Sequence, residues 1–351
     1  MPPKTMKAAQ WDPLQQKVVV NTIPIPSPAP HQILVKLASA SLCHSDLLAI
    51  NQPDLTEPFT LGHEGAGYIA ELGTNCTDKG FHEGDPVGFL YINGVCFECE
   101  GCLVHNILCS NGAPSVVGFG RSQGGAFGFF QEFAAVDWQN VVSLPSAMDP
   151  RRSSAVFCAG ITAFHAVDSC NLQKDQWFAA IGAGGLGQLA VQYAKAMGFK
   201  VLAIDINDKA LAACKEQGAD VTFNSLTQAE SYVAELKTLT NGGVHATAVF
   251  SGAPAAYKSA PGIIRPGGLM MVVGISPSPL ELSTYDLAIG SFAVKSESTG
   301  TPQRMGKAVR FTAEHGIMPE IDVRRGLEDV GEMVREMKMG ESSRRMAVVF
   351  D

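Results

Sequence analysis

A glycine-rich turn between an expected strand and an expected helix constrains the fold of this chain more than any other feature. Residues 177–181 form a short apolar run typical of a buried strand, and apolar residues recur at i, i+3 and i+4 spacing from 186 to 197, which predicts a helix. The turn that joins them is Gly182-Ala183-Gly184-Gly185-Leu186-Gly187. Strand, turn and helix in this order predict a βαβ unit, and therefore an α/β arrangement with a parallel sheet.

The glycines of this turn have the spacing of a dinucleotide-binding loop. Gly182 permits the tight turn, Gly184 lets the backbone approach a pyrophosphate, and Gly187 lets the helix pack closely on the sheet. The first N–H groups of the helix, at Gly185 and Leu186, are free to bind phosphate oxygens. The alternative is a glycine-rich turn that only joins a strand to a helix.

An acidic residue stands at the end of the next expected strand, residues 200–205. Asp205 can accept hydrogen bonds from both ribose hydroxyls of an adenosine, and its charge repels a 2′-phosphate. The sequence therefore predicts NAD(H) rather than NADP(H). In the alternative, Asp205 only caps the following segment. Separately, Lys209 either contacts the same ribose or is solvated.

The two halves of the chain differ in their sequence patterns. Between residues 60 and 145, glycine and proline recur among short apolar runs, which predicts an irregular domain rich in β-strands. From about residue 150 onward, strand-like and helix-like segments alternate. A chain of 351 residues is long enough for the two domains that this pattern indicates.

Charge and hydrophobicity exclude several classes of partner. The 34 acidic residues outnumber the 26 lysines and arginines, and the formal net charge of −8 disfavours binding to nucleic acid or to an anionic membrane. No segment has the roughly 20 consecutive apolar residues that span a bilayer, and the first residues lack the apolar run of a signal peptide. We expect a cytoplasmic protein with reduced cysteines.

Four of the nine cysteines are clustered. Cys96, Cys99, Cys102 and Cys109 offer four thiolates within a short segment, which is typical of a closed tetrahedral zinc site. Four protein ligands leave no position for a substrate, so we expect this zinc to be structural. The alternative is a set of unliganded cysteines on a loop.

Three further residues capable of binding a metal are dispersed. They are Cys43, His63 and Cys158. Their spacing does not connect them, and each taken alone is more typical of a buried core residue than of a metal ligand.

Taken together, six ordered motifs resemble the zinc-dependent medium-chain alcohol dehydrogenases, most closely the yeast type. They are Cys43-His44-Ser45-Asp46, Gly62-His63-Glu64 with Gly67, Gly84-Asp85 with Val87, the Cys96 cluster, Cys158-Ala159-Gly160-Ile161-Thr162 and the glycine turn. The resemblance implies a GroES-like catalytic domain at residues 1–154, to which residues 290–351 return, and a Rossmann domain at residues 155–289.

The resemblance also implies roles for individual residues. Cys43, His63 and Cys158 would bind a catalytic zinc, and the Cys96 cluster a second zinc, which makes two zinc ions per chain. Glu64 would be a nearby carboxylate able to visit the metal, and Asp46 would hold the free ring nitrogen of His63.

Around the cofactor and substrate, the resemblance implies three further roles. Ser45 would take the proton of the alcohol. His44 would contact the cofactor pyrophosphate, and Thr162 would lie beside the nicotinamide. The resemblance also implies a homo-oligomer, a tetramer or a dimer, formed through edge strands of the cofactor domain.

The chain departs from the yeast-type pattern at several positions. Leu48 replaces the histidine that ends the proton relay, and Asp54 and Tyr91 align with tryptophans that narrow the pocket for ethanol. These differences favour an alcohol or aldehyde bulkier than ethanol. The interval from Cys102 to Cys109 is one residue shorter than in the yeast-type enzymes, and the segment of residues 118–130 is longer than its counterpart there.

Three functions therefore remain in view. The first is a zinc-dependent oxidoreductase that moves a hydride between NAD(H) and an alcohol, aldehyde or ketone. The others are a zinc-free enoyl or quinone reductase of the same superfamily and a non-redox protein that binds NAD.

Overall fold

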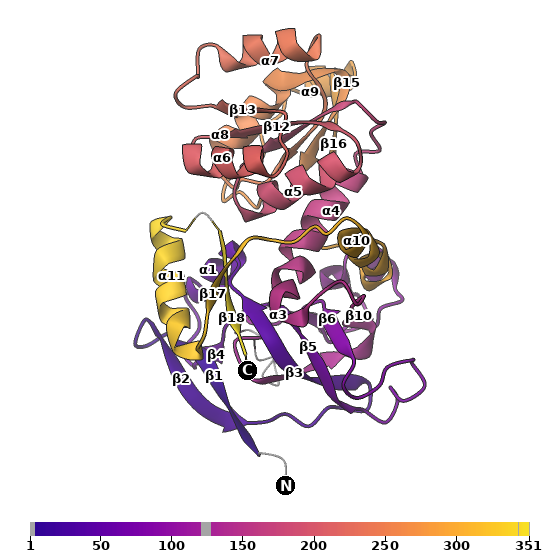
Figure 1. The fold of residues 1–351 in the computed structure, drawn as a ribbon, viewed down its shortest axis with the longest axis vertical. Coiled ribbons are helices and arrows are strands. Elements are labelled where there is room, and N and C mark those ends of the chain that lie inside the picture. Colours follow the sequence, from indigo (N-terminus) through magenta and orange to yellow (C-terminus); the bar gives the residue numbers. More distant parts are fainter. Residues whose placement is uncertain (1–3, 121–127, 343, 351) are drawn as a thin grey trace. The chain divides into compact units, whose positions relative to one another are not determined.

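The parallel sheet expected around the glycine turn is present as six strands in the computed structural model, which describes residues 4–120, 128–342 and 344–350 (Figure 1). In sheet order the strands are β13 (Val221–Asn224), β12 (Lys200–Asp205), β11 (Trp177–Ile181), β14 (Val244–Val249), β15 (Ile264–Val272) and β16 (Phe292–Ser296). The order reverses between β11 and β14, as in the Rossmann fold, where ligands bind beyond the carboxyl ends of the strands at such a reversal. The predicted α/β sheet is confirmed.

Helices precede and separate these strands, and α5 matches the helix predicted at residues 186–197. They are α4 (Ala159–Asp168), α5 (Gly185–Ala196), α6 (Asp208–Glu216), α7 (Tyr232–Thr240), α8 (Pro254–Ser259) and α9 (Thr284–Ala288). On α4 and α5, Phe164 and Tyr193 pack edge to face with ring centroids 5.5 Å apart, and both side chains are buried.

The N-terminal part and the C-terminal segment build a second, mainly antiparallel sheet. Along its main path the strands are β10 (Val141–Ser143), β6 (Pro86–Phe89), β5 (Glu64–Leu72), β3 (Gln32–Ser41), β18 (Arg345–Val349) and β17 (Ile321–Arg324), and β9 (Phe133–Asp137) also pairs with β3. The last strand of the chain, β18, is therefore the direct neighbour of β3. Two small sheets complete the β-structure: β2 (Lys17–Pro24), β1 (Thr5–Asp12) and β4 (Phe59–Thr60), and the pair β7 (Ile92–Asn93) and β8 (Ser115–Val116).

Helices connect these strands. They are α1 (His44–Ile50), α2 (Glu100–Val104), α3 (Pro150–Ser153), α10 (Pro302–Glu314) and α11 (Val330–Met339), with 3-10 turns that include η1 (Asn106–Leu108) and η3 (Ser154–Phe157). The irregular β-rich domain predicted from the glycine and proline spacing is thus present. In the part of the chain that the structure describes, no helix has both the length and the apolar character needed to cross a bilayer.

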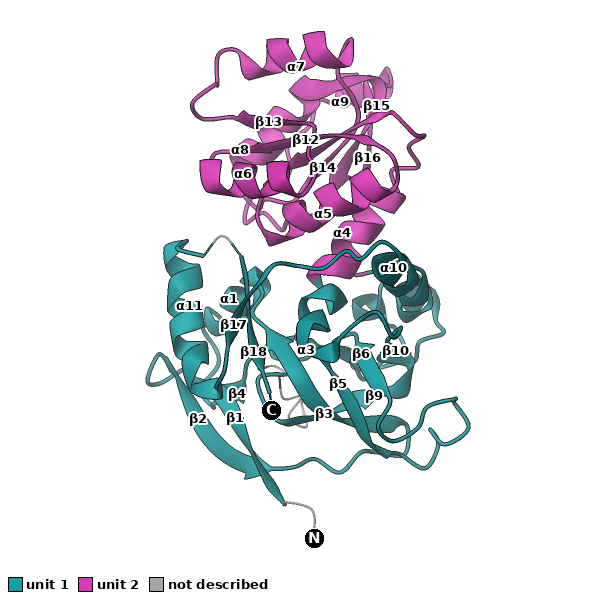
Figure 2. Ribbon diagram, viewed as in Figure 1, with its two compact units in different colours: residues 1–158, 300–351 teal, residues 159–299 magenta. Residues whose placement is uncertain are grey.

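The chain divides into two compact units (Figure 2). Unit 1 comprises residues 1–158 and 300–351, and unit 2 comprises residues 159–299. The boundaries inferred from the sequence, after residues 154 and 289, lie before these limits. The second difference has a simple cause, because β16 follows residue 289 and its pairing with β15 keeps it in unit 2.

Candidate active site and metal centres

Three dispersed metal-ligand candidates, Cys43, His63 and Cys158, lie together in unit 1. One donor atom from each of them and one carboxylate oxygen of Glu64 all lie within 4.8 Å of one another. All four side chains are buried. The site therefore gathers two thiols, one imidazole and one carboxyl group from three separate segments of the sequence.

The pairing of β3 with β5 brings the first two of these segments together. In the register of this antiparallel pair, Ser41 at the end of β3 lies opposite Glu64 at the start of β5. Cys43 follows Ser41 by two residues, and His63 immediately precedes Glu64. Cys158 comes from a third segment. It lies at the end of η3, which contacts both β5 and β3.

Asp46 connects the start of α1 to His63. Its Oδ2 accepts a hydrogen bond from the backbone N–H of Cys43 (2.8 Å), and its Oδ1 lies 2.7 Å from His63 Nδ1. Because a carboxylate accepts, the Nδ1 atom of His63 carries a hydrogen, and the Nε2 atom is the ring nitrogen left to bind a metal. Although burial disfavours a charged ring, the Asp46 carboxylate raises the pKa of His63 well above its usual value.

The two thiols of the site form a coupled pair. A hydrogen bond from the Cys158 thiol lowers the pKa of Cys43 well below its usual value, and the same contact together with burial raises the pKa of Cys158. Burial also raises the pKa of Glu64, to about 8. Buried thiols are costly to ionise without a cation, so the donor set fits a divalent metal ion that would be bound by both thiolates.

The contacts of the Glu64 carboxylate involve two residues that the sequence did not single out. Ser41 Oγ donates a hydrogen bond to Glu64 Oε2 (2.5 Å), and Arg345 Nη1 of β18 lies 3.3 Å from Oε1. Oε1 nevertheless has no hydrogen-bond partner among the described residues, and it is fully buried. An orphaned carboxylate oxygen next to two thiols also fits a nearby cation. Motif spacing carries no signal for Ser41 or Arg345, because strand pairing alone brings them here.

The helix α1 presents the remaining residues of the first motif. The Oγ atom of Ser45 lies 3.8 Å from Cys43 Sγ, so its hydroxyl stands beside the ligand set. His44 is exposed at the first position of α1. One turn beyond Ser45, the side chain of Leu48 is 49% exposed, so it faces open space rather than the core.

Aromatic rings flank His63. The ring centroids of Tyr91 and Phe119 lie 4.8 Å and 5.7 Å from that of His63, both in edge-on contact. The sequence indicated Tyr91 but not Phe119, which belongs to the glycine-rich segment 118–130. Residues 121–127 of that segment lie outside the described residues, and Asp54 is exposed.

The four clustered cysteines also converge. Their Sγ atoms are separated by 3.7 Å (Cys96 and Cys109), 3.9 Å (Cys96 and Cys102) and 4.0 Å (Cys99 and Cys109). A tetrahedral ion with Zn–S bonds of about 2.3 Å holds its sulfurs about 3.8 Å apart. The short interval before Cys109 therefore does not prevent a four-sulfur arrangement.

The environment of this cluster favours thiolates at two positions. Backbone N–H groups, chiefly those of Ser110 and Cys102, lower the pKa of Cys99 to about 5. The N–H of Cys96 likewise lowers the pKa of Cys109. Cys102 differs, since burial raises its pKa to about 12. Such N–H donors stabilise a negatively charged sulfur, and a cysteine that binds zinc is a thiolate of this kind.

The glycine turn of unit 2 has room for a ligand at its centre. Gly182 has a φ of +97°, and a side chain at Gly187 would place its Cβ 1.9 Å from the carbonyl oxygen of Gly182. At Gly184, the N-cap of α5, a Cβ would meet nothing within 4 Å. Packing within the protein therefore requires the first and last of these glycines, whereas the space at Gly184 suits a bound pyrophosphate.

Asp205 is tied to this turn. Its Oδ2 accepts from the N–H of Ala183 (2.6 Å), and its Oδ1 accepts from the N–H groups of Ile206 (2.7 Å) and Asn207 (2.9 Å). These hydrogen bonds support the local backbone, as expected if Asp205 caps the following segment. They also place the Asp205 carboxylate next to the glycine turn. Lys209 is exposed on α6.

Thr162, the remaining residue assigned to the cofactor, is buried on α4 in unit 2. It follows Cys158 by four residues. Its side chain therefore comes from the segment that also supplies the third metal-ligand candidate.

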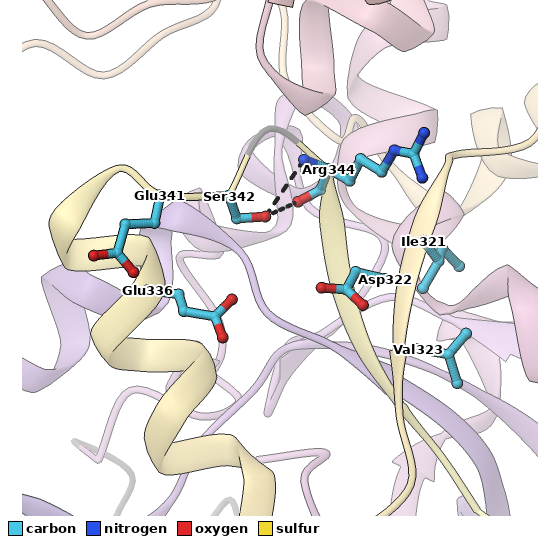
Figure 3. A pocket seen from close by; sticks show the side chains of 7 residues that line it. All are labelled: Ile321, Asp322, Val323, Glu336, Glu341, Ser342 and Arg344. Atoms are coloured by element: carbon cyan, nitrogen blue, oxygen red, sulfur yellow. Dashed lines mark hydrogen bonds between the residues drawn. The ribbon is translucent and has the colours of Figure 1, made fainter. Parts of the chain in front are cut away.

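A separate hollow of about 430 Å³ lies in unit 1 along α11 and β17 (Figure 3). Its carboxylates Asp322 and Glu336 are both paired with Arg324, at 2.8 Å each. In the same hollow, Ser342 Oγ donates to the carbonyl of Arg344 (2.7 Å). Both of these carboxylates already have an arginine partner, so we assign no chemistry to this hollow.

Comparison with known proteins identifies both halves of the chain. A sequence model described as a zinc-binding dehydrogenase matches residues 185–314, and one described as an alcohol dehydrogenase GroES-like domain matches residues 29–146. An alcohol dehydrogenase of Geobacillus stearothermophilus is 31% identical over 355 aligned residues, which cover 99% of this chain and 100% of that protein.

Solved structures share the fold. An alcohol dehydrogenase from the archaeon Aeropyrum pernix has a TM-score of 0.84 at 24% identity, covering 98% of this chain and 99% of its own. An acetophenone reductase from Geotrichum candidum, in complex with NAD, has a TM-score of 0.84 at 22% identity, covering 99% and 98%.

The four-sulfur geometry predicts a stability defect when one ligand is removed. A Cys99→Ser variant should lose one zinc per chain and unfold roughly 10 °C lower, since each kcal/mol lost shifts the midpoint of a domain of this size by about 2–4 °C. Metal analysis and thermal unfolding measure this. As a control, Cys76→Ser alters a buried thiol outside both clusters and should keep the full metal content. Equal stability and zinc content in Cys99→Ser and the parent would contradict the assignment.

Proposed function

We propose that this chain, which belongs to the zinc-type medium-chain alcohol dehydrogenase family, moves a hydride between NAD(H) and an alcohol at the site of Cys43, His63 and Cys158. As a member of this family the chain is an oxidoreductase that acts on alcohols. The convergence of those three side chains next to a serine hydroxyl carries the proposal.

Two zinc ions per chain fit the two donor sets. Cys43, His63 and Cys158 would hold the catalytic ion, because three protein ligands leave one position for a substrate oxygen. The four clustered cysteines would hold a structural ion, since a closed set leaves no such position. The two thiolates of the first set offset the formal charge of the metal, so that a neutral alcohol or carbonyl compound can bind and leave.

When bound, zinc supplies a Lewis acid that makes an alcohol more acidic, and NAD⁺ supplies the hydride acceptor. Ser45 accepts the proton of the alcohol through its hydroxyl, which lies beside Cys43. Asp46 accepts the hydrogen of His63 Nδ1 and fixes the ring, so that Nε2 is the ring nitrogen that would bind the metal. In the reverse direction, Ser45 returns the proton to the carbonyl oxygen.

The onward path of the proton differs from the yeast-type relay. Leu48 occupies the position of the relay histidine, and an exposed leucine carries no proton. We propose that the proton passes from Ser45 to a ribose hydroxyl of the cofactor and then directly to solvent.

For the cofactor we propose NAD(H), bound at the glycine turn of unit 2. The open space at Gly184 and the N-terminus of α5 suit the pyrophosphate, and Asp205 with Lys209 suits the adenosine ribose. The family resemblance assigns His44 to the pyrophosphate and Thr162 to the nicotinamide.

The substrate that we propose is an alcohol, aldehyde or ketone bulkier than ethanol, with an aromatic group. Tyr91 and Phe119 flank His63 with their rings, and Leu48 adds an exposed apolar side chain on α1. The acetophenone reductase that shares this fold is named for an aromatic ketone. A zinc-free reductase or a non-redox protein has no need of two converging ligand sets.

We also propose a cytoplasmic homo-oligomer, a dimer or a tetramer. Strand β16 pairs with β15 at the end of its sheet, and in the described part of the chain no strand covers its other edge. Such an edge suits pairing with the same strand of a second copy. The cysteines gathered as metal ligands, rather than disulfides, fit a reducing compartment. A monomer by light scattering at micromolar concentration would contradict the oligomer.

Turnover tests the proposed function. The purified protein should contain two zinc ions per chain and oxidise 1-phenylethanol with NAD⁺ at a higher kcat/KM than ethanol. Ser45→Ala should keep both ions and lose about 100-fold in kcat/KM, because proton transfer to a placed group contributes that much. Ser45→Thr, which keeps the hydroxyl, should restore most of the rate. A zinc-free preparation that reduces an enone but no ketone would overturn the proposal.

Asp205 predicts the cofactor preference. An Asp205→Asn variant removes the charge and keeps only one of the two oxygens that accept backbone N–H groups. Because a repulsion between two charges costs about 1 kcal/mol in water and more near a protein surface, kcat/KM with NADP⁺ should rise at least about tenfold. Asp205→Gly should raise it further and weaken NAD⁺ binding. The measurement is the ratio of kcat/KM for NAD⁺ and NADP⁺. A parent enzyme faster with NADP⁺ at equal concentration would show that Asp205 has no such role.

A further inference from the structure

Ser41 and Glu64 form a buried cross-strand pair directly behind the metal ligands. They lie opposite each other in the register of β3 and β5, and both side chains are 0% exposed. Side chains opposite each other in an antiparallel pair point to the same face of the sheet. The hydroxyl therefore meets the carboxylate, and Ser41 Oγ donates to Glu64 Oε2 at 2.5 Å.

Arg345 approaches the same carboxylate from the other side of β3. Ala347 lies opposite Ser41 in the pairing of β18 with β3, and Arg345 precedes Ala347 by two residues, so it shares that face. Its Nη1 atom donates to the carbonyl of Leu42 (3.1 Å) and lies 3.3 Å from Glu64 Oε1. Since Oε1 has no hydrogen-bond partner among the described residues, the hydroxyl of Ser41 supplies the hydrogen bond that this carboxylate receives there.

A carboxylate in this place competes with the substrate. A Glu64 oxygen lies within 4.8 Å of the donor atoms of Cys43, His63 and Cys158, and carboxylate oxygens are good zinc ligands. If Glu64 joined the set, four protein ligands would close the site, as in the cluster of four cysteines. An open metal position therefore requires that Glu64 be held back.

We propose that Ser41 is a positioning residue, whose hydrogen bond to Glu64 keeps that carboxylate out of the ligand set and leaves the fourth metal position open. This inference rests on the proposed function. A hydrogen bond to a charged group shifts an equilibrium of this kind about 10- to 100-fold. Loss of the Ser41 hydroxyl should therefore let Glu64 occupy the fourth metal position in a measurable fraction of the molecules.

The chain offers a matched control on the same strand. Ser39 precedes Ser41 by two residues on β3, faces the same side and is equally buried, but its hydroxyl donates to the carbonyl of Pro150 (2.6 Å). Ser39→Ala and Ser41→Ala thus remove the same group from the same strand. Only the second removes a contact to Glu64.

Cobalt(II) substituted at the catalytic site, with azide as a ligand for its open position, tests the proposal. The visible bands of the parent should change on titration with azide, and the apparent Kd should be about tenfold weaker in Ser41→Ala. Ser39→Ala should match the parent, and adding Glu64→Gln to Ser41→Ala should restore azide binding.

Two results would overturn the inference alone while the parent still binds cobalt and azide. One is an unchanged Kd in Ser41→Ala, and the other is an equal weakening in Ser39→Ala and Ser41→Ala. A Kd that stays weak in the double variant contradicts the role given to Glu64. If the parent binds no cobalt at Cys43, His63 and Cys158, or shows no azide response, the proposed function fails, and this inference fails with it.

Discussion

The buried carboxylate of Asp46 is the contact on which the arrangement of the site depends. One of its oxygens caps the backbone at Cys43, and the other holds the Nδ1 atom of His63 at 2.7 Å. One side chain thus orients two ligand candidates that come from different strand ends, and it selects the ring nitrogen that is left for the metal. The antiparallel pairing of β3 and β5 makes this contact possible, because it brings the end of one strand next to the start of the other.

The two thiol-rich centres of unit 1 differ in the way that separates structural from catalytic metal sites. The four cysteines from 96 to 109 lie in one short segment, their sulfurs have tetrahedral spacing, and no other candidate ligand from the described residues joins them. The other set combines three ligand candidates from three segments with the carboxylate of Glu64, which contacts Ser41 and Arg345. A closed set can stabilise an irregular lobe, whereas a set of three with an open position can bind a substrate.

Much of the fold was predictable because local patterns report local structure. The apolar run at 177–181, the glycine turn and the periodicity that follows predicted β11 and α5, and residues 200–205 form β12 as expected. The contacts around Glu64 were not predictable, because Ser41 and Arg345 reach it through strand pairing between distant segments. The contact of Phe119 with His63 was not predictable for the same reason, since it follows from tertiary packing.

The domain limits and the site roles differ in how much the sequence could say about them. Strand β16 belongs to unit 2 through its hydrogen bonds with β15, which no change of composition marks. Cys43, His63 and Cys158 were connected by family resemblance and not by spacing, and the structure brings their donor atoms within 4.8 Å of one another together with an oxygen of Glu64.

Anomalous diffraction at the zinc edge, from crystals of the purified protein, would locate the metal ions directly. We expect one anomalous peak at bonding distance from both thiolates and from His63 Nε2 but not from Glu64, and a second peak among the four cysteines. A disulfide between Cys43 and Cys158, with no peak beside His63, would contradict this expectation.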